Sequence, residues 1–183
     1  YVSPDQWDQE AAIARIKKKF GIEGPLIQGY DHPYLSLTND ITRNPRIDLA
    51  ARDTMIANEL VALPGVSYAI PSSSLEGGTV PDNLLMRAVL NNYNAARSGN
   101  IYVVFKPGWF INDLDGLSVA VVHGSPWRYD TYVPIIFAGY GTRPQKVSRR
   151  VHTVVVAITL ATAVGTRPPS GAAGDVLLEV LGQ

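Results

Sequence analysis

Apolar residues recur at helical spacing in the first half of the chain and predict three helices. Ile13, Ile16 and Phe20 are three or four residues apart and are followed by a glycine, which commonly ends a helix. The same spacing runs through 48–63, where Pro-Gly follows, and through 81–93, where Pro-Asp opens the stretch. Each of these stretches therefore has one apolar face to bury against a common core.

Shorter apolar runs separate these helices and predict strands. The expected strands lie at 26–27, 34–37, 66–70 and 101–105. The first two flank the turn Asp31-His32-Pro33, and the last is apolar throughout, as expected of a strand buried on both faces. Residues 34–105 thus run strand, helix, strand, helix, strand, which predicts a small α/β layered unit.

The pattern of apolar residues is less regular in the second part of the chain. Strands are expected near 119–122 and 133–137, and a stretch near 149–156 should run into a helix that ends at about 164. A loop at 165–171 and a short final element at 176–181 complete the prediction. We interpret this part as the C-terminal edge of a larger sheet.

These elements divide the chain into three predicted parts. They are an N-terminal helix at 1–23, a small α/β subdomain at 24–110 and a C-terminal segment at 111–183. The chain starts at a tyrosine rather than at a methionine, so we interpret it as a piece of a longer protein.

Composition narrows the possible functions. Sixteen basic residues balance sixteen acidic ones, and the only basic run, 17–19, closes a predicted helix, so no nucleic-acid surface is expected. No run approaches the roughly 18 apolar residues that a membrane span needs. The absence of cysteine excludes disulfides, thiol catalysis and cysteine–metal sites, and it is compatible with the cytoplasm and the periplasm alike.

His123 is the most informative residue. It opens a His-Gly-Ser-Pro turn that leads into an apolar run, an arrangement that presents one imidazole at the lip of a sheet. A neutral imidazole held in this way suits a metal ion, although a hydrogen-bonded turn histidine would give the same pattern. The chain has only 3 histidines, so any further ligands of His123 are carboxylates or lie on other polypeptide.

The other two histidines are weaker candidates. Asp31 and His32 form a dipeptide that could supply two metal ligands, but the following proline is typical of an exposed turn. His152 lies in an alternating segment and is expected on a surface strand.

Several segments resemble one enzyme family in the right order. The run from Ser98 to Trp109 resembles the SGD–strand–KPGW segment of bacterial alkaline phosphatase superfamily enzymes. The run from His123 to Phe137 is similar to their THGSPYxYDTHVPxxF segment, and 153–161 falls where they usually read TVDIAPTLA. The resemblance extends from about residue 9 to the C-terminus. It points to the zinc-dependent phosphate-monoester hydrolases and the type I phosphodiesterase/nucleotide pyrophosphatase group.

The resemblance implies that His123 is a ligand to one of two zinc ions. In that family the other ligands and a Thr or Ser nucleophile come from earlier polypeptide, and nothing in this chain matches them. Asp31 and His32 align with a different segment, so the family's Asp-His ligand role is not transferred to them. We therefore expect zinc to bind this chain weakly at most, and we identify no catalytic or substrate-binding residue in it.

The sequence departs from the family pattern in one direction. Val155 stands for an aspartate, Ile158 for a proline and Tyr132 for a second histidine. Each change introduces a bulkier, more apolar side chain. The changes favour either a parent enzyme with altered or lost activity or better apolar packing in an isolated domain.

We therefore predict the C-terminal part of a metal-dependent phosphate mono- or diester hydrolase, inactive without the N-terminal half that would be its partner. Asp130 is expected to fix the His123 turn, and Arg128 to meet a substrate phosphate or remain exposed. A mononuclear site of His123 with Asp113 or Asp115 is a weaker alternative. The rival prediction is a non-catalytic domain that self-associates through an exposed sheet edge. The resemblance favours a periplasmic or secreted protein.

Overall fold

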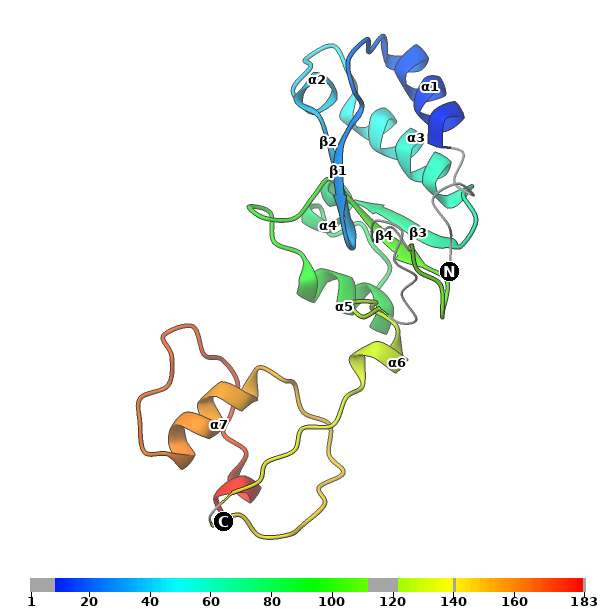
Figure 1. The fold of residues 1–183 in the computed structure, drawn as a ribbon. Coiled ribbons are helices and arrows are strands. Elements are labelled where there is room, and N and C mark those ends of the chain that lie inside the picture. The colour runs from blue at the N-terminus through cyan, green and yellow to red at the C-terminus, as the bar shows by residue number, and fades with distance from the viewer. Residues whose placement is uncertain (1–8, 112–121, 140, 183) are drawn as a thin grey trace. The chain divides into compact units, whose positions relative to one another are not determined.

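The computed structural model describes residues 9–111, 122–139 and 141–182 (Figure 1). The chain forms two compact units, Tyr1–Tyr132 and Val133–Gln183. The first unit therefore includes His123. The functional boundaries predicted at 23/24 and 110/111 remain predictions.

The first unit is built on a four-stranded antiparallel sheet. Its strands are β1 (Ile27–Asp31), β2 (Tyr34–Leu37), β3 (Val66–Pro71) and β4 (Ile101–Phe105). Their order is β1-β2-β4-β3, so β4 lies inside the sheet and β1 and β3 form its edges. The predicted α/β class is confirmed, and all four strands lie within or next to the predicted runs.

Six helices accompany this sheet among the described residues. They are α1 (Gln9–Phe20), α2 (Asn39–Thr42), α3 (Leu49–Val61), α4 (Ser72–Glu76), α5 (Leu84–Asn92) and α6 (Arg128–Thr131). The carboxylate of Asp48 begins α3 by accepting hydrogen bonds from the backbone N–H groups of Ala50 and Ala51. Asn83 caps α5 in the same way through Met86. The polar residue directly before α3 and the one directly before α5 thus satisfy some of the first N–H groups of these helices.

The apolar core lies on both faces of the sheet, in one cluster with residues of α1 and α3 and a second with residues of α4 and α5. Along β4, Ile101, Val103 and Phe105 point into the cluster that includes α1 and α3 residues. Tyr102 and Val104 point into the second cluster, with Leu75 of α4 and residues of α5. All five residues of β4 are buried because alternate side chains of a strand face opposite sides of a sheet.

The second unit contains a helix and a single 3-10 turn among its described residues. Helix α7 (Val155–Ala163) packs against the 3-10 helix η2 (Leu178–Leu181). The buried hydroxyl of Thr159 donates to the Val155 carbonyl at 2.7 Å and accepts from the Leu177 N–H at 3.1 Å. Arg149 forms a two-point ion pair with Glu179 of η2. The final element is therefore helical, and polar contacts tie it to the rest of this unit.

Two strand predictions in the C-terminal part are wrong. Residues 133–137 form no strand, because Pro134 lacks an N–H donor and no described strand pairs with this run. Residues 149–154 are likewise irregular before α7 begins, so His152 is exposed but not on a strand. Of the strand predicted near 119–122, residues 119–121 lie outside the described ranges. No helix within the described ranges combines the length and apolar character that crossing a membrane requires.

Candidate functional site

The loop that carries His123 is anchored to the end of β4. The Trp127 indole N–H donates to the Phe105 carbonyl at 2.7 Å, and the Trp127 ring packs against the second core cluster. The Tyr129 hydroxyl accepts a hydrogen bond from the Gly108 N–H at 3.0 Å. Two aromatic residues of the His123 motif thus bind the Phe105–Gly108 backbone, which is part of the other family-like segment. The structure brings the two segments together, although the sequence separates them.

Asp130 has the turn-fixing role that the sequence predicts. Its Oδ2 accepts the Ser125 N–H at 2.6 Å, which closes the turn immediately after His123 and Gly124. The Ser125 hydroxyl is buried and has no hydrogen-bond partner among the described residues. Arg128 is exposed, with its Cζ 5.1 Å from the centre of the Tyr132 ring, a cation–π geometry. Tyr132, which replaces the family's second histidine, therefore contacts Arg128.

His123 itself presents an exposed side chain at the start of this turn. The structure places the Asp31–His32 turn beside it, a proximity that the sequence analysis missed. A Cβ added to Gly124 would lie 3.3 Å from His32 Cδ2 and 3.5 Å from its Nε2. The imidazole also stacks on Phe105, with ring centres 6.3 Å apart and planes 20° apart. The sequence indicates only that His32 lies in a turn. A turn prediction does not identify the loop that the turn will contact.

Burial of the His32 ring favours its neutral form. Packing against Phe105 and Gly124 lowers the pKa of His32, since burial disfavours the charged form, and this is the largest effect. The negative charge of Asp130 and a hydrogen bond to the Gly124 backbone act in the opposite direction and raise the pKa. The positive form of His123 would lower it further. Because burial outweighs the opposing effects, the net pKa lies below the usual value.

The described residues do not form a complete metal site. No three His, Asp or Glu side chains among them lie close enough together to hold a metal ion. His123 could therefore supply one ligand, but His32 and Asp130 beside it do not complete a set. Asp113 and Asp115, the alternative partners of His123, lie outside the described residues.

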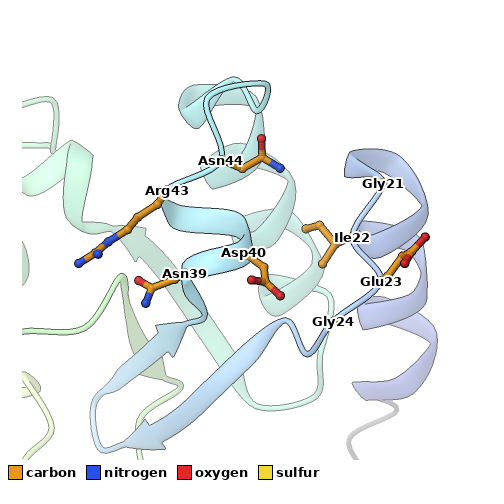
Figure 2. A pocket seen from close by; sticks show the side chains of 8 residues that line it. All are labelled: Gly21, Ile22, Glu23, Gly24, Asn39, Asp40, Arg43 and Asn44. Atoms are coloured by element: carbon orange, nitrogen blue, oxygen red, sulfur yellow. The ribbon is translucent and has the colours of Figure 1, made fainter.

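A separate polar hollow of about 440 Å³ lies between the α1–β1 loop and α2. Its charged side chains do not converge: in Figure 2, Asp40 points toward Gly24, Arg43 points away from it and Glu23 points outward on the other side. A Cβ on Gly24 would come within 2.3 Å of Asp40 Oδ2, so this glycine lets the carboxylate lie against the backbone. The hollow shows no arrangement that would hold a charged ligand, and none of the predicted site residues lines it.

Comparison with known proteins shows which sequences this chain resembles. Over 92% of its length the chain is 27% identical to a protein named calcium-transporting ATPase from Myroides odoratus. It is 26% identical over 93% to alkaline phosphatase PafA of Elizabethkingia meningoseptica, and 27% identical over 78% to alkaline phosphatase PhoV of Synechococcus elongatus. The chain is thus similar in sequence to alkaline phosphatases over most of its own length. The resemblance predicted from the His123 and Trp109 segments is therefore confirmed.

The structural comparison shows the same fold. The crystal structure of alkaline phosphatase PafA matches 99% of this chain with a TM-score of 0.78 at 23% identity, and a mutant of that enzyme matches 95% with a TM-score of 0.76. The chain spans only about a third of these solved chains, and 25–30% of the curated relatives, toward their C-terminal side. No protein-family model matches it.

The anchoring role of Trp127 can be tested by removing the hydrogen bond of its indole N–H. Trp127→Phe retains an aromatic ring but loses the indole donor to the Phe105 carbonyl. The free energy of unfolding should fall by about 1 kcal/mol, the net contribution of a typical hydrogen bond. Urea denaturation measures this change, and Trp109→Phe at the more exposed Trp109 is the matched control. Equal effects of the two substitutions would contradict the anchoring role.

Proposed function

We propose that the chain is the C-terminal-side part of a metal-dependent phosphate ester hydrolase, in which His123 supplies one zinc ligand. The observation that supports this proposal best is the exposed His123 imidazole at the start of a turn fixed by Asp130 and anchored to β4. A fixed backbone presents the imidazole in one direction, which metal coordination requires. The names of the relatives support phosphate ester hydrolysis as the chemistry.

The remaining ligands are proposed to come from polypeptide outside this chain. The described residues hold no group of three ligands, whereas a catalytic zinc site needs at least three protein ligands for each ion. We therefore expect two zinc ions in the longer protein, weak binding at most in these 183 residues, and no turnover by the chain alone.

The test compares zinc-dependent hydrolysis of p-nitrophenyl phosphate by the longer protein and by its His123→Ala variant. Loss of a residue that only supports a metal ligand typically reduces metal affinity or activity by roughly 10–100-fold. Loss of the ligand itself should therefore reduce zinc affinity and activity by at least as much. His152→Ala is the matched control, because His152 is exposed and lies in the other unit. The 183-residue chain should show no turnover, with or without zinc. Zinc-dependent turnover that survives His123→Ala would contradict the proposal.

A non-catalytic role is the second candidate, and one contact favours it. Val155, which replaces the family's aspartate, is buried at the start of α7, and a Cβ on Gly174 would lie 2.9 Å from its Cγ1. The valine thus packs where a carboxylate would need a polar partner. Under this proposal the longer protein shows no zinc dependence, and edge strands β1 and β3 provide surfaces for self-association. Sedimentation of the chain over a concentration series would reveal such association.

A further inference from the structure

The turn between β1 and β2 makes a specific contact with the His123 loop. The Tyr30 hydroxyl and His32 Nδ1 are 2.8 Å apart, and the two rings meet edge to face with centres 6.2 Å apart. The same imidazole lies against Gly124, since a Cβ added there would be 3.3 Å from its Cδ2 and 3.5 Å from its Nε2. Tyr30, His32 and Gly124 therefore form a continuous chain of contacts from the hairpin to the residue that follows His123.

We infer that His32, oriented by Tyr30, is a positioning residue that fixes the backbone of the His123 loop. The consequence for zinc depends on the proposed function, whereas the positioning itself does not. His32 is assigned no ligand role.

The hydrogen bonds of His32 distinguish positioning from metal binding. A neutral imidazole has one N–H donor and one acceptor nitrogen. Nδ1 shares a hydrogen bond with the Tyr30 hydroxyl, and the Nε2 side of the ring faces Gly124. Nδ1 is thus engaged by Tyr30 and the rest of the ring by its contact with the loop, an arrangement that suits positioning. His32 and His123 are both exposed residues, so the ring contacts of His32 are what distinguish the two.

The shape of the loop fits the imidazole closely. Gly124 has φ of 100°, a conformation that side chains with a Cβ rarely adopt. The missing Cβ also leaves the space that the His32 ring fills, since an added Cβ would be 3.3 Å from Cδ2. The backbone is thus held on one side by His32 at Gly124 and on the other by Asp130 at Ser125. Because Gly124 follows His123 directly, fixing its peptide restricts the direction of the His123 side chain.

Hydrogen exchange in the 183-residue chain tests the positioning directly. The readout is the exchange rate of the Ser125 amide, with the Ile56 amide of α3 as an internal reference for global unfolding. His32→Ala should speed Ser125 exchange about five- to tenfold, as expected for loss of one hydrogen bond, without changing Ile56. Tyr30→Phe should act in the same direction but less strongly. His32→Gln, which retains a donor and an acceptor, should restore a rate close to that of the unchanged chain, and His152→Ala is the matched control.

Unchanged Ser125 exchange in His32→Ala would overturn the inference. Equal acceleration at Ser125 and Ile56 would also overturn it, since that pattern indicates general destabilisation.

Isothermal titration of the metal-free longer protein with Zn²⁺ then tests the consequence for zinc binding. His32→Ala should weaken zinc binding about 10–100-fold, as loss of an outer supporting residue typically does, and His32→Gln should weaken it less. If His123→Ala leaves zinc binding unchanged while the exchange result holds, the proposed function fails and the positioning role stands.

Discussion

Asp53→Ala is expected to lower the free energy of unfolding of the first unit by about 3–5 kcal/mol, the usual cost of leaving one partner of a buried ion pair alone. Arg52 and Asp53 of α3 are only 6% and 4% exposed. The Arg52 Nε and Nη2 atoms donate to Asp53 Oδ1 at 2.7 and 2.5 Å. The Ser73 hydroxyl of α4 donates to Oδ2 of the same carboxylate. Removing the carboxylate therefore leaves a guanidinium and a hydroxyl without their main acceptor in a place that water does not freely reach.

Urea denaturation of the chain measures this loss, and the more exposed ion pair between Arg15 of α1 and Glu59 of α3 provides the control. The Arg15 guanidinium donates to both carboxylate oxygens of Glu59, but the Arg15 side chain is 57% exposed. Glu59→Ala should therefore cost less than about 1 kcal/mol. The double variant Arg52→Met/Asp53→Leu removes both charges and should be more stable than Asp53→Ala. A loss in Asp53→Ala no larger than that in Glu59→Ala would show that burial does not strengthen this pair.

Ile101→Ala is expected to destabilise the first unit by about 2–5 kcal/mol through lost apolar burial and the cavity that remains. Ile101 has no exposed surface and lies on β4, the strand that pairs with both β2 and β3. The core cluster that contains it draws on residues of α1, α2, α3, β2 and β3, so several elements would have to shift to fill the space.

A graded series separates this cavity effect from a general change in strand preference. Ile101→Val removes one methylene and should cost about 0.5–1.5 kcal/mol. Ile136→Ala, at a residue that is 83% exposed, should stay within about 0.5 kcal/mol. The three values come from thermal or urea unfolding, and an Ile101→Ala effect as small as that of Ile136 would mean that β4 is not the centre of the core.

The local pattern of the sequence predicted most elements of the first unit. The boundaries of α3 and β4 lie within a residue or two of the predicted ones, because the spacing of apolar residues reflects which face each element buries. The pattern failed at 133–137. A run of apolar residues predicts a strand only if another strand offers its N–H and C=O groups, and no described strand does so there.

The candidate site likewise combines local contacts, which the sequence indicates, with long-range contacts, which it does not. The sequence singled out His123 and the turn-fixing Asp130, since both act within one short loop. The contacts of Trp127 with Phe105 and of His32 with Gly124 join residues that are far apart in the chain. Neither the spacing of apolar residues nor the turn residues encode such pairings, so the sequence alone does not reveal the role of His32.

The sequence by itself therefore determined the strands and the three longer helices of the first unit and the similarity to alkaline phosphatases, and it singled out His123 as a predicted metal ligand. Only the tertiary structure decided the antiparallel order β1-β2-β4-β3, the pairing of Arg52 and Asp53 with Ser73, and the contact of His32 with the His123 loop. The physical reason is the range of the interactions. Periodicity and capping act between residues a few positions apart, whereas strand order and buried polar contacts depend on how the whole chain packs.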